Sequence, residues 1–386
     1  MSEKKCDIGL LGLGVMGRNF ALNMADKGFR VGVFNRTEEK ARRFMKEKVG
    51  DRPIEAGYSL DEFTKLLKKP RAILIFVPAG KPVDEGINEL TLTLDSQDLI
   101  VDCGNSHFQD TDRRAEVLAN RGFLFLGMGV SGGESGARHG PSMMPGGSAE
   151  GYERVREILE ASAAQVNGEP CVAFLGPGSA GHYVKMVHNG IEYGIMEIIA
   201  ESYDLLRRGL NMDPEDLASV YANWNKGKLN SYLVEITSRV LQRKDDKTGK
   251  PLIDMIADRA RQKGTGKWTS LDALELQTPI PVIDAAVTMR NMSDYQDERR
   301  AASEALPGPS KAFEGNRESL VGWLEKALIS TATITYAQGM SLLRQASLSY
   351  EYKLDMEAVA RIWRGGCIIR AALLEDIRSA FRSQPN

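Results

Sequence analysis

The sequence predicts a doubly wound α/β domain followed by an all-α domain. Over about the first 175 residues, short and nearly continuous apolar runs alternate with helical stretches. A glycine-rich turn follows the first of these runs, and strand-like runs almost vanish in the second half. Strands that are apolar throughout and separated by helices are typical of a parallel sheet covered on both faces.

The predicted strands of the first domain are Cys6–Leu11, Arg30–Phe34, Ala72–Val77, Leu99–Asp102, Phe123–Met128 and Cys171–Leu175. Its predicted helices include Arg18–Lys27, Asp110–Arg121 and Gly151–Ser162. A junction rich in glycine, proline and serine at residues 176–181 separates the two domains.

Beyond this junction, an amphipathic stretch without proline predicts one long helix over His182–Arg208. The further predicted helices are Pro214–Trp224, Asn230–Leu241, Pro281–Ser303, Glu318–Glu351 and Asp355–Trp363. We therefore place a Rossmann-like domain over residues 1–177 and an all-helical domain over residues 178–386. Because helices this long often carry a subunit interface, we also expect an oligomer.

The composition excludes several classes of function. Lys and Arg number 50 against 52 Asp and Glu, a formal net charge of −2, which argues against a nucleic-acid coat and a polybasic membrane binder. No apolar run is long enough to span a bilayer, and we predict no signal peptide. The four cysteines are far apart and form no Cys-x-x-Cys motif, so we expect a cytoplasmic protein without a disulfide framework or a zinc site.

A dinucleotide site is predicted where the first strand runs into Gly12-Leu13-Gly14-Val15-Met16-Gly17. This G-x-G-x-x-G motif lies between a strand and a helix, as its mechanism requires. Gly12 allows the tight turn, Gly14 lets the backbone approach a pyrophosphate, and Gly17 allows close helix–strand packing. The alternative is a glycine-rich turn that binds no ligand.

The end of the second strand indicates which dinucleotide binds. The strand is followed by Asn35-Arg36-Thr37, with no carboxylate to bond a ribose 2′-hydroxyl. The Arg36 guanidinium and the polar side chains beside it match a 2′-phosphate, so we predict NADP rather than NAD. In the alternative interpretation, Thr37 only caps the helix that begins near Glu38, and Arg36 is solvated.

Two more strand ends are expected at the same edge of the sheet, where ligands of such domains bind. They are Val77-Pro78-Ala79 and the loop that carries Asn105. Asn105 could reach both cofactor and substrate, although Gly104-Asn105 taken alone is more often a simple turn.

The long helix carries the predicted chemistry. Lys185, His188, Asn189 and Glu192 have offsets of 0, 3, 4 and 7, which share one helix face. Such polar groups on an interior face would be costly unless they bind something polar. The alternative is a solvated stripe with a Lys185–Glu192 ion pair. No second histidine or carboxylate has ligand spacing here, so we predict no metal.

Two loops suit anionic groups. Gly129-Val-Ser131-Gly132-Gly133 follows a strand and offers successive backbone amides to a carboxylate or sugar oxygens. Gln262–Trp268 places Lys263 and Thr265 among glycines, which suits a phosphate, although the spacing is not that of a P-loop. Without further context, the second loop is equally well a surface turn.

Six motifs in order resemble the decarboxylating, NADP-dependent 6-phosphogluconate dehydrogenase family of the pentose phosphate pathway. They are Gly9–Gly17, Asn35–Thr37, Gly127–Gly133, Lys185–Tyr193, Gln262–Thr269 and Trp363–Arg370. The resemblance runs from Ile8 to about Asn386. It implies a homodimer that converts 6-phospho-D-gluconate to D-ribulose 5-phosphate and CO2 as NADP+ is reduced to NADPH.

The resemblance also implies roles for individual residues. Lys185 resembles the general base that takes the proton of the substrate 3-hydroxyl, and Glu192 the acid that protonates C1 of the enediol. The implied contacts to substrate hydroxyls and carboxylate come from Asn105, Ser131, Gly132, Gly133, His188 and Asn189. The implied phosphate pocket consists of Tyr193, Lys263, Thr265 and Arg290.

Two features depart from the family pattern. Pro78 stands where many members have a longer polar residue. The sequence stops at Gln384-Pro385-Asn386, and nothing in it matches the family's C-terminal tail, which supplies an arginine and a histidine to the partner's site. Two alternatives therefore stay open: another β-hydroxyacid dehydrogenase, such as one acting on 3-hydroxyisobutyrate, and a truncated, inactive NADP-binding protein.

Overall fold

A computed structural model of the chain describes residues 4–308 and 313–384. It divides into two compact units, the first formed by Met1–Met186, Ala346–Cys367 and Arg378–Asn386 and the second by Val187–Gln345 and Ile368–Ile377. The outer ends of the two predicted domains, residues 1 and 386, lie outside the described residues, as do Pro385 and Asn386 of the predicted chain end. The predicted boundary between residues 177 and 178 stays a prediction.

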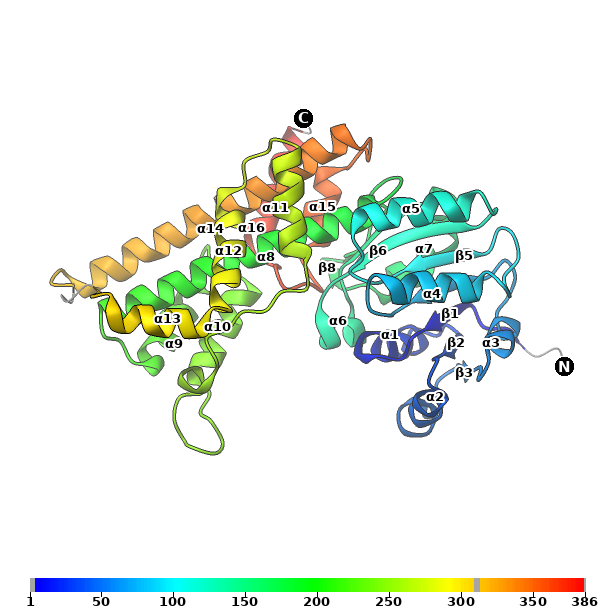
Figure 1. Cartoon of the computed structure of the whole chain (residues 1–386), viewed down its shortest axis with the longest axis horizontal. Coiled ribbons are helices and arrows are strands. Elements are labelled where there is room, and N and C mark those ends of the chain that lie inside the picture. Colours follow the sequence, from blue (N-terminus) through cyan, green and yellow to red (C-terminus); the bar gives the residue numbers. More distant parts are fainter. Residues whose placement is uncertain (1–3, 309–312, 385–386) are drawn as a thin grey trace. The chain divides into compact units, whose positions relative to one another are not determined.

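The first unit is built on a seven-stranded sheet with the strand order β3-β2-β1-β4-β5-β6-β7, drawn in colours from blue through cyan to blue-green in Figure 1. The strands are β1 (Ile8–Leu11), β2 (Val31–Phe34), β3 (Ile54–Ala56), β4 (Ala72–Ile75), β5 (Leu99–Asp102), β6 (Leu124–Val130) and β7 (Met143–Gly147). All neighbouring pairs are parallel except β6 and β7. The order reverses at β1 and β4, and the crevice beyond such a point is where ligands bind.

Helices cover both faces of this sheet, which confirms the predicted doubly wound fold. The core on one face includes side chains of α1 (Val15–Asp26) and α7 (Ala149–Ser162), and the core on the other includes side chains of α3 (Leu60–Leu66), α4 (Lys81–Leu90) and α5 (Phe108–Ala119). Leu74 of β4 packs into the first core, and its neighbours Ile73 and Ile75 pack into the second. Since both faces are buried, every position of the strand is apolar.

The helices of the first unit are α1 (Val15–Asp26), α2 (Glu38–Phe44), α3 (Leu60–Leu66), α4 (Lys81–Leu90), α5 (Phe108–Ala119), α6 (Gly133–His139), α7 (Ala149–Ser162) and α15 (Met356–Ile362). The π-helical turn Met45–Val49 extends α2, and a small hairpin joins β8 (Gln165–Val166) to β9 (Glu169–Pro170). The last helix of the chain, α16 (Leu373–Ser383), belongs to the first unit from Arg378 onward.

The predicted strand Cys171–Leu175 is wrong. This segment lies along β7, but its only pairing with β7 is one isolated bridge, between Val172 and Met143, and two scattered backbone hydrogen bonds. The edge position belongs instead to β7, an antiparallel strand that its Pro145-Gly-Gly sequence did not suggest. The sequence interpretation also missed the three-residue strand β3, which is too short to show a period.

The second unit is helical. Its helices are α8 (Ala180–Asp204), α9 (Pro214–Trp224), α10 (Tyr232–Gln242), α11 (Thr265–Glu275), α12 (Pro281–Ser293), α13 (Gln296–Ala305) and α14 (Arg317–Ser349), joined by the short helical turns Leu205–Gly209 and Leu252–Met255. Helix α8 begins in the first unit and continues into the second, and α14 ends in the first unit. In the described part of the chain, no helix combines the length and apolar character needed to cross a membrane.

The single helix predicted over Pro281–Ser303 is two helices, so this prediction is wrong. The chain leaves the helical path at Asp294 and Tyr295. There the Ser293 hydroxyl donates to the Arg290 carbonyl oxygen at 2.6 Å. Short polar side chains compete in this way with the backbone hydrogen bonds of a helix, which hydrophobic periodicity does not reveal.

Candidate active site

The glycine turn between β1 and α1 is packed tightly at its two ends and open in the middle. A Cβ atom on Gly12 would lie 2.3 Å from the Phe76 carbonyl oxygen, and one on Gly17 would lie 2.0 Å from the Gly12 carbonyl oxygen. Nothing lies within 4 Å of a Cβ built on Gly14, the residue just before α1. The open backbone at a helix N-terminus fits the pyrophosphate of a dinucleotide.

Asn35 ties this turn to the end of β2. Its side-chain oxygen accepts a hydrogen bond from the Leu13 backbone N–H at 3.0 Å, and its amide donates to the Thr37 carbonyl oxygen at 2.9 Å. Thr37 occupies the N-cap position of α2, but its side chain accepts no capping hydrogen bond. The capping role considered for Thr37 is therefore absent.

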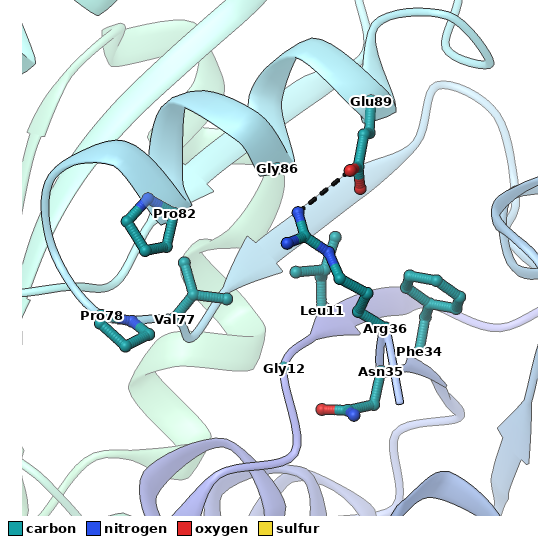
Figure 2. A pocket seen from close by; sticks show the side chains of 10 residues that line it. All are labelled: Leu11, Gly12, Phe34, Asn35, Arg36, Val77, Pro78, Pro82, Gly86 and Glu89. Atoms are coloured by element: carbon teal, nitrogen blue, oxygen red, sulfur yellow. Dashed lines mark hydrogen bonds and ion pairs between the residues drawn. The ribbon is translucent and has the colours of Figure 1, made fainter. Parts of the chain in front are cut away.

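A pocket of about 190 Å³ lies at the carboxyl ends of β1, β2 and β4. Figure 2 shows its lining residues, which are Leu11, Gly12, Phe34, Asn35, Arg36, Val77, Pro78, Pro82, Gly86 and Glu89. The pocket thus joins three of the segments predicted to bind the cofactor: the glycine turn, the end of β2, and the residues after β4.

Arg36 is exposed to solvent and paired with two carboxylates. Its Nη1 lies 3.1 Å from Glu85 Oε2 and its Nη2 3.0 Å from Glu89 Oε1, both on α4. In Figure 2 the Arg36 and Glu89 side chains point toward one another. The hydrogen bond to Glu85 and the charge of Glu89 raise the pKa of Arg36, which stays a cation. Its side chain is 63% exposed, so a phosphate could reach it.

Lys185 lies directly against β6. A Cβ atom built on Gly129 would lie only 2.3 Å from Cβ of Lys185, and the lysine is 6% exposed. Two residues further on, the Ser131 N–H donates to the Ser142 carbonyl oxygen at 2.9 Å. Gly132 and Gly133 both have positive φ, at 102° and 59°. The first unit therefore brings Lys185 close to the loop predicted to bind a carboxylate.

In the second unit, α8 continues with the other polar residues of the predicted face. His188 is fully buried, and its Nδ1 lies 3.1 Å from Asn189 Oδ1. The Asn189 amide donates to Thr265 Oγ1 at 3.1 Å. Glu192 is partly buried one turn further along. Because Lys185 and His188 are buried, the alternative of a solvated stripe does not hold for these two residues.

The residues of the predicted phosphate pocket gather at the start of α11. The Arg290 guanidinium lies 3.6 Å from the centre of the Tyr193 ring, and Arg290 is 9% exposed. A Cβ atom on Gly266 would lie 2.5 Å from the same ring, so Thr265 is held beside it. Lys263 is exposed two residues earlier. A buried guanidinium stacked on an aromatic face is a rigid donor suited to phosphate.

Two family models together match almost the whole chain. The NAD binding domain of 6-phosphogluconate dehydrogenase matches residues 7–176, and the 6-phosphogluconate dehydrogenase C-terminal domain matches residues 181–386. The decarboxylating 6-phosphogluconate dehydrogenase of Schizosaccharomyces pombe is 50% identical over 100% of this chain and 79% of its own length. The chain belongs to the 6-phosphogluconate dehydrogenase family.

Other members of the 6-phosphogluconate dehydrogenase family agree with this assignment. The NADP(+)-dependent, decarboxylating enzyme of Bacillus subtilis is 48% identical over 99% of this chain and 81% of its own length. The solved 6-phosphogluconate dehydrogenase of Plasmodium falciparum superposes with a TM-score of 0.93 at 44% identity, covering 99% of this chain and 82% of that one. The chain thus spans about four fifths of the length of these relatives.

The 3-hydroxyisobutyrate dehydrogenases, considered above as an alternative, share the fold of this chain but have little sequence identity with it. A 3-hydroxyisobutyrate dehydrogenase from Salmonella typhimurium superposes with a TM-score of 0.55 at 19% identity, over 76% of this chain. At this identity the likeness shows the fold alone. The family models and the curated relatives, by contrast, confirm the predicted membership of the 6-phosphogluconate dehydrogenase family.

The sequence interpretation missed the partners that hold the site residues of this family member. Glu85 and Glu89, which pair with Arg36, lie four residues apart on α4 and carry no motif. Asp102 and Arg114 form a buried ion pair behind Asn105. Only the charge of Asp102 at the end of an otherwise apolar strand could have signalled this pair. Within residues 4–308 and 313–384, no three His, Cys, Asp or Glu side chains gather so as to hold a metal ion.

Proposed function

We propose that this chain catalyses the oxidative decarboxylation of 6-phospho-D-gluconate to D-ribulose 5-phosphate and CO2, with NADP+ as the oxidant. The observation that carries the proposal is the buried Lys185 held against Gly129, in a member of the 6-phosphogluconate dehydrogenase family. A lysine with little exposure beside a glycine-rich loop is suited to exchange a proton with a bound substrate rather than with water.

When bound, NADP+ supplies the acceptor for the hydride that leaves C3 of the substrate. For its binding we propose Gly12, Leu13, Gly14, Val15, Met16, Gly17, Asn35, Arg36, Thr37, Val77, Pro78, Ala79 and Asn105. The open backbone at Gly14 supports the pyrophosphate site, and the exposed guanidinium of Arg36 supports the 2′-phosphate site. Asn35 additionally fixes the turn through its hydrogen bond to Leu13.

Lys185 and Glu192 move the protons in this proposal. Lys185 Nζ takes the proton of the 3-hydroxyl during oxidation, which leaves a β-keto acid. The protonated amine then neutralises the developing enolate as CO2 departs, and returns its proton to the ketone oxygen. The Glu192 carboxyl group, about two turns along α8, delivers a proton to C1 of the enediol while Lys185 Nζ takes the proton of the enediol hydroxyl, which gives the ketone. Each such transfer typically contributes 10²–10⁴-fold to the rate.

The remaining side chains hold the substrate. We propose that Asn105, Ser131, Gly132, Gly133, His188 and Asn189 bind its hydroxyl and carboxylate groups. The phosphate is assigned to Tyr193, Lys263, Thr265 and Arg290. The buried stacking of Arg290 on Tyr193 favours a phosphorylated substrate over 3-hydroxyisobutyrate, which has no group that needs this guanidinium.

We also propose that the chain forms a homodimer through α14. This helix has 33 residues, and its outer side carries apolar and small residues at helical spacing, all of them exposed. They are Trp323, Ala327, Ser330, Ile334 and Ala337. An exposed Trp and Ile on one stripe are typical of a covered interface. The four cysteines are buried and none is in a disulfide, which suits a reducing compartment, so we propose a cytoplasmic location.

The experiment that tests the function is a turnover assay on the purified chain. We expect NADPH formation from 6-phosphogluconate that is lost in Lys185→Ala, while the Kd for NADP+ changes less than about threefold. Lys228→Ala, an exposed lysine on the second unit, is the matched control and should keep full turnover. Normal turnover in Lys185→Ala would refute the role of this lysine, and NADP+ binding without turnover in the unaltered chain would favour a non-catalytic protein.

A further inference from the structure

Arg114 of α5 is a buried cation at the carboxyl edge of the sheet. Its side chain is 2% exposed. The guanidinium donates through Nε to Asp84 Oδ1 at 2.7 Å and through Nη2 to the Gly80 carbonyl oxygen at 3.1 Å. Through Nη1 it donates to Ser106 Oγ at 3.2 Å and Asp102 Oδ2 at 3.3 Å. One side chain therefore joins groups from two separate loops.

The first of these loops carries Asn105. The Asp102 carboxylate accepts hydrogen bonds from the Gly104 N–H at 2.9 Å and from the Ser106 hydroxyl at 2.6 Å. The Asp102 carboxylate therefore bonds both Gly104, which precedes Asn105, and Ser106, which follows it. Gly104 and Ser106 are buried, whereas Asn105 between them is exposed. The loop is anchored on both sides, and only the Asn105 side chain is presented outward.

The second loop carries Val77–Ala79. It ends at Gly80, where α4 begins, and Asp84 lies in the first turn of that helix. Arg114 bonds both Gly80 and Asp84, and its hydrogen bond holds the pKa of the Asp84 carboxyl below its usual range. The two loops approach one another, because a Cβ built on Gly104 would lie 3.5 Å from the Val77 carbonyl oxygen.

We propose that Arg114 is a positioning residue that sets the spacing between the Asn105 loop and the Val77–Ala79 loop, and thereby the width of the cofactor site. The inference rests on the proposed function, in which both loops contact NADP+. Its physical basis is that a buried guanidinium is costly unless all its donors are satisfied, so the four acceptors cannot shift independently. Sites of this kind lose much of their efficiency when a supporting group lets them move by about 1 Å.

The test compares Arg114→Lys with a matched change at Arg71. Arg71 also forms a buried ion pair in this unit, with Asp98, and a second pair with the exposed Asp95, but it directly precedes β4 at the amino edge of the sheet. Lysine keeps the positive charge but lacks the planar guanidinium group, which donates hydrogen bonds to several acceptors at once. We expect both variants to lose thermal stability, and only Arg114→Lys to raise the Kd for NADP+, by roughly tenfold.

A second measurement separates positioning from a general structural role. If Arg114 acts through Asn105, the effects of Arg114→Lys and Asn105→Ala on the Kd should be clearly less than additive in the double variant. Additive effects, or an equal rise in Kd for Arg71→Lys, would overturn the proposal. Calorimetric titration with NADP+ measures the unaltered chain, the three single variants and the double variant.

If Arg114→Lys does not fold, Asp84→Asn tests the same link, because the Asp84 side chain is one third exposed and the change removes only its charge. We expect this variant to raise the Kd about threefold, and an unchanged Kd would overturn the proposal. Failure of the proposed function would appear differently, as an unaltered chain that binds NADP+ but forms no NADPH. An active chain whose Kd is insensitive to Arg114→Lys would refute only the positioning role.

Discussion

The backbone of Gly129 on β6 touches the side chain of Lys185 on α8, so closely that a Cβ atom on the glycine would lie 2.3 Å from Cβ of the lysine and 2.8 Å from its Cγ. The glycine is required at this point because any side chain would displace the lysine. The other glycine of β6, Gly127, is required for a different contact, because a Cβ atom there would lie 2.5 Å from Thr111 Cγ2.

This contact predicts that Gly129→Ala shifts Lys185 and reduces turnover. We expect a loss of about 1–3 kcal/mol in the free energy of unfolding, as for other overpacked sites, and a fall in kcat with little change in the Kd for NADP+. Gly322→Ala is the control, since nothing lies within 4 Å of that position on α14 and alanine favours the helix. Denaturant unfolding and steady-state kinetics check both, and an unchanged kcat in Gly129→Ala would contradict the assigned geometry.

Substitutions at Arg36 should change the preference of the protein for NADP+ over NAD+. Arg36→Gln should weaken NADP+ binding by about 10–100-fold, the value of one lost charge-assisted hydrogen bond of about 1.5–3 kcal/mol, and leave NAD+ binding nearly unchanged. Arg36→Glu should shift the preference further toward NAD+. Glu89→Gln keeps the guanidinium and should preserve the preference for NADP+. Competitive titration with the two cofactors measures the ratio, and a constant ratio in Arg36→Gln would argue against the 2′-phosphate site.

The stacked Arg290 predicts how the enzyme recognises the phosphate end of its substrate. Arg290→Met should raise the KM for 6-phosphogluconate about 10–100-fold, and we expect turnover of unphosphorylated gluconate to be weak and equal in the variant and the unaltered chain. Arg239→Met, an exposed change on α10, serves as the control and should leave both activities intact. Equal losses for the two substrates would show that Arg290 supports the fold and does not bind phosphate.

A cluster around Glu169 predicts a pH-dependent part of the stability. Hydrogen bonds from the buried Arg378 and Arg364 lower the pKa of Glu169 from 4.5 to about 2. Because the folded-state pKa is the lower one, this stabilisation is complete above about pH 4.5 and disappears as the pH falls toward 2.

Glu169→Gln should therefore have a lower Tm than the unaltered chain at pH 7, and the difference should shrink between pH 4.5 and 2. Glu153→Gln, whose partner Arg156 is exposed, should show almost no difference at any pH. Thermal unfolding followed by circular dichroism across this range is the measurement. A Tm difference for Glu169→Gln that does not vary with pH would contradict the electrostatic origin.

Hydrophobic periodicity and capping residues correctly predicted the helices and strands whose bounds depend on local sequence. Helix α9 begins at the predicted residue because Asp213 caps it and Pro214 starts it, both of which are local signals. It also ends at the predicted Trp224. One failure has a long-range cause, and the other has a local cause that hydrophobic periodicity does not show. β7 forms because β6 offers it an edge, and the break after Ser293 follows from a side chain that bonds its own helix.

The sequence by itself determined the alternation of strands and helices in the first unit, the helical character of the second, the glycine turn, the absence of a carboxylate after β2, and the four polar residues at helical spacing on α8. Each of these features depends on residues only a few positions apart, so it can be recognised in the sequence. Only the tertiary structure decided that Gly129 meets Lys185, that Arg290 stacks on Tyr193, and that Arg114 joins two loops. Each of these contacts joins residues far apart in the sequence, and the packing of the whole core fixes which distant residues meet.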